Sequence, residues 1–255
     1  MRSTHFVPVE GDERIALDWT VPENPDGSRA AVFVHGFASN RQGEKATFFA
    51  ECFQAVGWHF LSLDMRGHGD SSAGMESLTL SRCIADLAAA LDWLPAGMAP
   101  PLLIPSSMGG AVAAWYHLLH PGRVGGLACI APSFNFPGSL FTELDARELE
   151  AWRTSGLRRI RNEWLDVQVG YGLMEDAKGY DAERLVRDYA APTLIFHGMK
   201  DDAVDWRASR RFVENCPCET LDLLLIKEGD HRLTDYKTYM FEIMLAWIKR
   251  LGGQG

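Results

Sequence analysis

The chain has 255 residues, of which 47% are hydrophobic and 23% charged, and its formal net charge at pH 7 is −9. This composition is ordinary for a globular protein with a full core, and the acidic balance argues against nucleic acid or an anionic membrane as a partner, because both select for basic surfaces. No apolar stretch approaches the ~20 residues that span a bilayer, and Met1 to Gly11 lacks the apolar run of a secretory signal. We therefore expect a cytoplasmic protein.

The five cysteines are an odd number scattered through apolar segments. That pattern is typical of reduced core thiols and argues against a disulfide framework. Cys216-Pro217-Cys218 resembles half of a metal site, but no second cysteine pair or nearby histidine pair accompanies it. We expect neither a bound metal nor another cofactor.

Strands and helices alternate along most of the chain. Two short segments of alternating hydrophobicity come first, and the Gly11-Asp12 turn between them predicts an antiparallel hairpin. Strands are expected at 6–9, 15–21, 30–34, 60–63, 102–104, 124–131, 193–197 and 221–226. Helices are expected at 47–56, 79–94, 108–120, 206–213 and 237–251. This alternation predicts a mostly parallel sheet of about eight strands with helices on both faces.

The pattern changes between residues 134 and 191, where no buried strand is evident. Amphipathic pieces are expected there instead, at 145–152, 157–169 and 182–189, and the first opens with a capping-box spacing at Asp145 and Glu148. The insertion is too long to be a structureless connection. We interpret residues 135–190 as a helical cap inserted into an α/β core formed by residues 1–134 and 191–255.

The sharpest signal is the junction of a strand and a helix at residues 104–110, which holds two adjacent serines. Such a turn, a nucleophile elbow, exposes one hydroxyl and needs small residues two positions before and after it. Ser107 has Pro105 and Gly109 at those positions, whereas Ser106 has isoleucine and methionine. Ser107 is therefore the expected nucleophile.

A nucleophilic serine needs a base and a group that orients the base. The expected base is His231, in the loop between the last strand and the last helix, although an ordinary surface histidine is the alternative for this residue alone. The expected acid is Asp201, which follows a buried strand, with Asp202 as its competitor. The order Ser, Asp, His along the chain is the one expected for such a triad on a mostly parallel α/β sheet.

Acyl transfer also needs donors for the developing oxyanion. One candidate is the backbone N–H of Met108, at a helix N-terminus where the helix dipole favours negative charge. The other is the backbone N–H of Phe37, in the loop after the 30–34 strand, where Gly36 allows a close approach.

Several stretches of the chain resemble signatures of the α/β-hydrolase superfamily. They are His35-Gly36-Phe37, Asp64 to Ser72 (DMRGHGDSS), Ser106-Ser107-Met108-Gly109-Gly110, His197-Gly198-Met199-Lys200-Asp201 and Gly229-Asp230-His231. The resemblance implies an α/β-hydrolase fold, a Ser107–Asp201–His231 triad and an oxyanion hole at Phe37 and Met108. The second stretch resembles a turn that is structural in the family. Pro105 departs from the glycine usual at its position.

A narrower resemblance concerns the abhydrolase-domain group that includes mitochondrial palmitoyl-protein thioesterase and acyl-glucuronide esterase activities. It rests on residues 40–46 (NRQGEKA) together with the stretches around Ser107, Asp201 and His231. This resemblance implies hydrolysis of a small ester or thioester substrate.

Aromatic residues of the expected cap are candidates for the substrate pocket, namely Phe136, Trp152 and Trp164, and the alternative is that they pack the cap onto the core. Two other functions stay open: a C–C bond hydrolase of dienoate products of ring cleavage, and a non-catalytic binding protein on the same fold. A homodimer also stays open.

Overall fold

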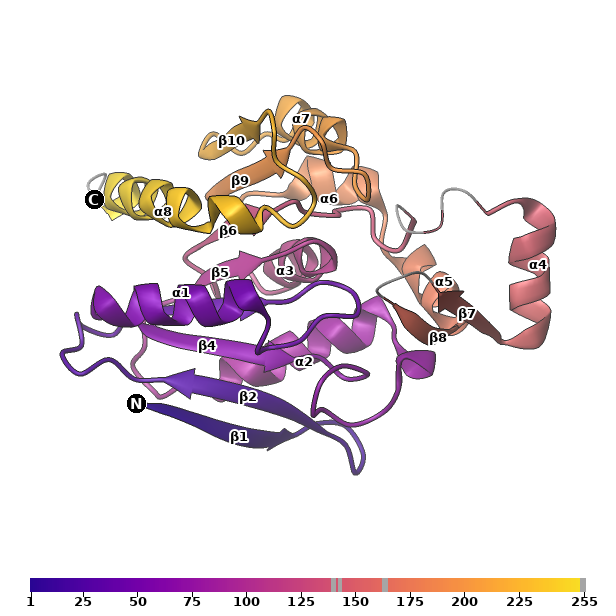
Figure 1. The fold of residues 1–255 in the computed structure, drawn as a ribbon, viewed down its shortest axis with the longest axis horizontal. Coiled ribbons are helices and arrows are strands. Elements are labelled where there is room, and N and C mark those ends of the chain that lie inside the picture. Colours follow the sequence, from indigo (N-terminus) through magenta and orange to yellow (C-terminus); the bar gives the residue numbers. More distant parts are fainter. Residues whose placement is uncertain (139–140, 142–143, 162–164, 253–255) are drawn as a thin grey trace.

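The computed structural model describes residues 1–252 except 139–140, 142–143 and 162–164. Its centre is an eight-stranded sheet with the strand order β1-β2-β4-β3-β5-β6-β9-β10 (Figure 1). Strand β2 is antiparallel to both of its neighbours, and every other adjacent pair is parallel. The expected α/β-hydrolase fold with a mostly parallel sheet is confirmed.

The sheet strands are β1 (Arg2–Pro8), β2 (Arg14–Thr20), β3 (Ala30–Val34), β4 (His59–Asp64), β5 (Leu102–Pro105), β6 (Gly126–Ile130), β9 (Thr193–Gly198) and β10 (Leu221–Ile226). The α-helices around it are α1 (Glu44–Ala55), α2 (Leu80–Asp92), α3 (Met108–Leu119), α6 (Ala182–Asp188), α7 (Trp206–Asn215) and α8 (Lys237–Gly252). Strands β3, β5, β6 and β9 are buried along their whole length. Their near-continuous apolar sequences follow from this, because helices cover both faces of a parallel sheet.

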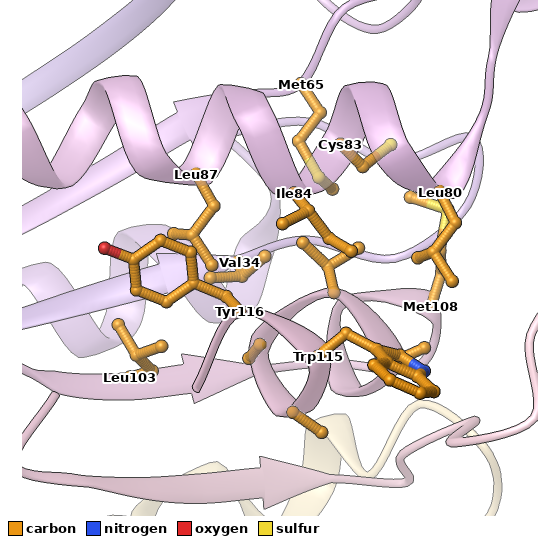
Figure 2. Close-up of a cluster of buried hydrophobic side chains, with 14 of the residues drawn as sticks. Val34, Met65, Leu80, Cys83, Ile84, Leu87, Leu103, Met108, Trp115 and Tyr116 are labelled. Atoms are coloured by element: carbon orange, nitrogen blue, oxygen red, sulfur yellow. The ribbon is translucent and has the colours of Figure 1, made fainter. Parts of the chain in front are cut away.

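Two hydrophobic clusters lie on opposite faces of the sheet. One contains residues of α2 and α3, and the other contains residues of α1 and α8. Figure 2 shows Ile84 and Leu87 of α2 pointing toward α3 and the sheet, close to Val34 and Tyr116. The side chain of Met108, the first residue of α3, is fully buried in the same cluster. This packing fixes the N-terminus of α3 relative to the sheet.

Between β6 and β9 the chain forms a cap of α4 (Ala146–Ser155), an antiparallel hairpin of β7 (Leu157–Arg161) and β8 (Asp166–Gly170), α5 (Gly172–Asp176) and α6. Asp145 and Glu148 form the expected capping box at the start of α4. The expectation of an amphipathic cap helix over 157–169 is wrong, because this segment is the hairpin. Val167 and Val169 are β-branched and alternate with polar residues, which favours a strand.

The cap is tied to the core through its hairpin and α5. Strand β8 packs against the 3₁₀ turn η1 (Met75–Ser77). The carboxylate of Asp176 in α5 accepts hydrogen bonds from the backbone N–H and the hydroxyl of Ser81, at the start of α2. These contacts hold the cap at the end of the sheet where the parallel strands finish, beside α2 and η1 (Figure 1).

Candidate active site

Ser107 occupies a strained turn between β5 and α3. Its φ of 53° and ψ of −119° lie outside the regions that ordinary side chains prefer, and such strain occurs at functional sites when the surroundings enforce it. The Ser107 N–H donates to the Ile130 carbonyl, and the N–H of Gly109 donates to the Ser106 carbonyl. A side chain at Gly109 would overlap the carbonyl oxygen of Val34. The glycine therefore allows α3 to begin directly beneath β3.

Pro105 replaces the glycine usual two residues before the nucleophile, and the sheet accommodates it. On the β3 side, Pro105 is in register with Val34. On the β6 side the regular pairing stops after Leu103, and only the bridge between Ser106 and Ile130 follows. Because N–H groups alternate between the two sides of a strand, the missing N–H of Pro105 faces this interruption toward β6. The cost is limited to this one position, because the same register resumes at Ser106 and the Ser107 N–H again donates to β6.

Three polar side chains from distant parts of the sequence form a continuous hydrogen-bonded chain. The Oγ of Ser107 lies 3.0 Å from Nε2 of His231, and Nδ1 of His231 lies 2.8 Å from Oδ2 of Asp201. The His231 side chain is 24% exposed, whereas that of Asp201 is fully buried. The structure therefore brings together the serine, the histidine and the aspartate that the sequence singled out.

Asp201, and not Asp202, contacts the histidine. Its Oδ1 accepts the backbone N–H groups of Ala203 and Val204 at 2.9 and 2.7 Å. Burial by itself raises the pKa of this carboxyl, but the hydrogen bonds from His197 and His231 outweigh it and hold the pKa of Asp201 well below its usual range. Asp201 is therefore a carboxylate at neutral pH.

His197 is a partner of Asp201 to which the sequence analysis gave no role. Its ring is fully buried, and Nε2 lies 3.0 Å from Oδ2 of Asp201 and 3.1 Å from the Val204 carbonyl. Since a carbonyl only accepts, Nε2 carries the proton, and Nδ1 accepts the hydroxyl of Ser209 at 2.8 Å. The sequence feature that could have predicted this contact is the four-residue spacing of His197 and Asp201 across a tight turn at the end of a buried strand.

Of the two expected oxyanion donors, Met108 directly follows Ser107 as the first residue of α3, and Phe37 lies in the loop after β3. Gly36 brings the Phe37 loop close, because a Cβ there would sit 3.0 Å from the Cβ of Ser107. Among the described residues, neither of the two amides donates a hydrogen bond to another protein group. Both remain available to an oxygen bound beside Ser107.

Ser107 opens into a cavity of about 900 Å³ with many polar groups in its walls. Lys45 of α1 lines it, and the Lys45 ammonium donates to the Arg232 carbonyl at 2.7 Å, which ties α1 to the loop of His231. Burial lowers the pKa of Lys45 to about 8. The residues around this cavity are Phe33, Gly36–Ser39, Gly43–Ala46, Ser106, Ser107, Leu165, Lys200, Asp202, Ala203, Asp230–Arg232 and Thr234.

A second cavity, of about 870 Å³, lies between α6, α7 and the loop after β6. Ala203 lines both cavities, so both border the loop that carries Asp201. The walls of this second cavity are largely apolar and include Phe134, Val186 and Phe212. The rings of Phe134 and Phe212 stack with 4.1 Å between their centroids.

The aromatic residues expected in the substrate pocket have other positions. Trp152 is 2% exposed inside the cap, and its indole N–H donates to the Val169 carbonyl at 3.0 Å. Phe136 is 6% exposed and packs against Phe37. Neither lines one of the two cavities, and Trp164 lies outside the described residues. Trp152 packs the cap and Phe136 packs the loop of Phe37, which was the alternative given for these aromatics.

Within the part of the chain that the structure describes, no three His, Cys, Asp or Glu side chains are placed to hold a metal ion. No helix among the described residues has the length and apolar character needed to cross a membrane.

Comparison with known proteins agrees with this geometry. A family model called Hydrolase_4, described as serine aminopeptidase S33, matches residues 26–166. The chain belongs to the Hydrolase_4 family. The matched region runs from before β3 through the nucleophile elbow and into the cap.

Relatives of this Hydrolase_4 member have known names and structures. The mitochondrial palmitoyl-protein thioesterase ABHD10 of Bos taurus is 24% identical over 82% of this chain and 68% of its own. The structure of mouse α/β hydrolase domain-containing protein 10 superposes with a TM-score of 0.82 at 22% identity, covering 99% of both chains. A putative hydrolase from Agrobacterium vitis S4 superposes with a TM-score of 0.85 at 25% identity, covering 97% of this chain and 98% of that one.

Proposed function

We propose that this α/β-hydrolase cleaves carboxylic esters or thioesters through an acyl-enzyme on Ser107. The observation that carries the proposal is the hydrogen-bonded chain from Ser107 through His231 to the buried carboxylate of Asp201. Ser107 and Phe37 line the polar cavity, and among the described residues the backbone amides of Phe37 and Met108 donate to no other protein group. The relationship to a palmitoyl-protein thioesterase supports an ester or thioester as the substrate.

In the proposed cycle, His231 takes the hydroxyl proton of Ser107 as its Oγ attacks the substrate carbonyl carbon. The carbonyl oxygen becomes an oxyanion, which the N–H groups of Phe37 and Met108 stabilise by about 3–4 kcal/mol each. His231 then protonates the leaving alcohol or thiol as its bond to the carbonyl carbon breaks. Water, deprotonated by His231, attacks the acyl-enzyme and releases the acid.

The buried Asp201 carboxylate has two tasks in this cycle. It accepts the Nδ1 proton of His231, so that Nε2 faces Ser107 as a base, and it stabilises the imidazolium that forms when His231 accepts the serine proton. Its own low pKa keeps it ionised while His231 is protonated. We further propose that the polar cavity around Lys45 receives the leaving group and that the apolar cavity between α6 and α7 receives the acyl chain.

The test is turnover of p-nitrophenyl butyrate combined with labelling by a fluorophosphonate probe. We expect Ser107→Ala to lower kcat by about 10⁶-fold and to abolish labelling while the protein stays folded. Peptide mapping of the labelled wild type should locate the adduct on Ser107. An adduct on another residue, or turnover by Ser107→Ala close to wild type, would contradict the proposal.

Asp201 and Asp202 form a matched pair for the acid role. We expect Asp201→Asn to lower kcat by about 10⁴-fold, because an amide no longer fixes the productive tautomer of the histidine. Asp202→Asn should cost at most about tenfold in kcat, because Asp202 lines the polar cavity but does not hydrogen-bond to His231. Equal losses in the two variants would remove the acid role from Asp201.

Wild-type protein that binds the probe but turns over no ester requires a wider substrate panel. A dienoate ring-cleavage product in that panel distinguishes the C–C hydrolase alternative, and peptide substrates address the aminopeptidase description of the family model. Absence of both labelling and turnover would favour a non-catalytic binding protein. The cytoplasmic location and the homodimer stay predictions.

A further inference from the structure

We propose that His68, from the turn that follows β4, is a positioning residue for the oxyanion hole. Its ring Nε2 accepts the backbone N–H of Ala38 at 3.2 Å, immediately after the Phe37 amide. The inference rests on the proposed function, because it assigns His68 a role in orienting an amide that acts only in acyl transfer. The sequence analysis gave the turn from Asp64 to Ser72 a structural meaning alone.

The protonation of His68 follows from its partners. A backbone N–H can only donate, so the Nε2 atom that receives it from Ala38 is unprotonated. Nδ1 therefore carries the proton, and it points to the Arg66 carbonyl at 3.3 Å. Burial lowers the pKa of His68, which is 5% exposed, so the ring remains a neutral acceptor around neutral pH.

His35 holds the preceding peptide unit in the same way. Its Nε2 accepts the Met65 N–H at 3.1 Å, so its Nδ1–H donates to the Gly36 carbonyl at 2.7 Å. In a trans peptide the carbonyl and the N–H point in opposite directions. Fixing the Gly36 oxygen therefore fixes the direction of the Phe37 N–H, which belongs to the same peptide unit.

The two histidines thus hold two consecutive peptide units around Phe37. Their ring centroids lie 4.7 Å apart. His35 follows the end of β3, and His68 lies in the turn after the adjacent strand β4. Ala38 has a φ of 52°, which is unfavourable for a residue with a side chain and persists only where the surroundings enforce it. The acceptor on His68 supplies that enforcement at the Ala38 N–H.

The same turn holds the loop of Phe37 at a second point further along. Oδ1 of Asp64 accepts the backbone N–H of Arg41 at 2.6 Å, and the Arg41 guanidinium forms an ion pair with Asp70 at 2.7 Å. These contacts anchor the distant end of the loop. The hydrogen bond from Ala38 to His68 is the contact directly beside the amide that the oxyanion would use.

Three variants test this role. His68→Leu removes the acceptor at similar size, whereas His68→Gln keeps an oxygen near the position of Nε2. Met244→Ala is the control, because it creates a core cavity under α8, on the opposite face of the sheet, in the cluster that contains neither Phe37 nor Met108. We expect His68→Leu to lower kcat for p-nitrophenyl butyrate by about 10²-fold, the effect of losing one oxyanion donor, with KM within about twofold. His68→Gln should recover most of this loss.

An interaction used only in the transition state lowers kcat and leaves KM unchanged, which loss of folded protein does not imitate once active sites are titrated. Met244→Ala should lose thermal stability and keep its kcat per active site. A second readout needs no substrate: hydrogen exchange of the Ala38 amide should accelerate in His68→Leu and stay as in wild type in His68→Gln.

Three results would overturn the inference: kcat of His68→Leu within twofold of wild type, an equal loss of kcat in Met244→Ala, or no recovery in His68→Gln. If His68→Leu does not fold, a kcat for His68→Gln more than tenfold below wild type would also contradict it. Wild-type turnover together with the effect of Ser107→Ala tests the proposed function separately, so failure of either idea is recognisable.

Discussion

At the scale of single residues, the site depends on which ring nitrogen of each histidine carries a proton. His197 and His231 both donate to the Asp201 carboxylate. On either side of Phe37, His35 donates to the Gly36 carbonyl and His68 accepts the Ala38 amide. Among these histidines, His231 alone reaches Ser107 and would exchange its proton during turnover. The other three keep their surroundings in one hydrogen-bonding pattern.

The low pKa of Asp201 makes a prediction about stability against pH. A carboxyl whose pKa is lower in the folded state stabilises the fold fully above its unfolded pKa of about 3.9, and this contribution is lost as the pH falls toward the folded pKa. The difference in unfolding free energy between wild type and Asp201→Asn should therefore be smaller at pH 3 than at pH 5. Urea unfolding at both pH values measures it, with Asp202→Asn as the control. An unchanged difference would mean that Asp201 is not held ionised.

The identities of the site residues were predictable from the sequence, but their supports were not. The three triad residues each follow an apolar strand or lie in a short loop with recognisable neighbours. Their residue types and their order along the chain were therefore sufficient to predict Ser107, Asp201 and His231 as the triad. The contacts of His68 with Ala38 join positions thirty residues apart. Nothing local in the sequence pairs them, because the pairing depends on β3 and β4 being adjacent in the sheet.

At the scale of elements, the elbow combines one proline and one glycine with opposite demands. Pro105 needs a gap in hydrogen bonding, and Gly109 needs a space without a side chain. β5 lies between β3, which pairs with it through Pro105, and β6, where the pairing is interrupted between Leu103 and Ser106. Pro105 stands in that interruption, and Gly109 lies against the Val34 carbonyl of β3.

Substitution of these two residues should have different effects. Pro105→Gly should lower the free energy of unfolding by about 0.5–1 kcal/mol, because glycine makes the unfolded chain more flexible, and kcat should not change. Gly109→Ala should lower it by about 1–3 kcal/mol through overlap with the Val34 carbonyl and should also reduce kcat. Thermal unfolding and ester turnover measure both. A loss of activity in Pro105→Gly would show that the proline itself shapes the elbow.

The bounds of the elements were predictable where apolar runs or caps are clear, as in β3 and α2. The hairpin of β7 and β8 was missed because the sequence of 157–161 (LRRIR) has too few apolar residues to distinguish a strand from a helix. Its strand conformation depends on pairing with β8, and the ion pair of Arg159 with Asp166 across the two strands adds to it.

At the scale of the whole molecule, two cavities border the loop of Asp201, and each has cap residues in its walls. The polar cavity is built entirely from core residues apart from Leu165, whereas the apolar cavity is bounded by α6 of the cap and α7 of the core. The sequence predicted a cap over the sheet but assigned its aromatic residues to the pocket. The two with described positions pack inside the protein instead. The Trp152 indole donates a hydrogen bond within the cap, and Phe136 packs against Phe37.

Filling the apolar cavity tests its proposed role for the acyl chain. Val186→Trp places a large side chain in the cavity, and Arg184→Trp on the same helix places one outside its walls. We expect Val186→Trp to lower kcat/KM for p-nitrophenyl palmitate at least roughly tenfold, the effect of losing a few buried methylenes, and to leave the butyrate ester unaffected. Equal effects on both esters, or on both variants, would place the acyl chain elsewhere.

The position of the cap in the sequence has a consequence for how such a protein can evolve. Ser107 and both amides precede the insertion, and Asp201 and His231 follow it, so the reacting groups and their supports are encoded by the two flanking segments. An insertion or deletion between β6 and β9 alters the walls of the apolar cavity without moving the strands that carry those groups. The type of reaction and the substrate specificity can therefore evolve independently, each through changes in its own part of the gene.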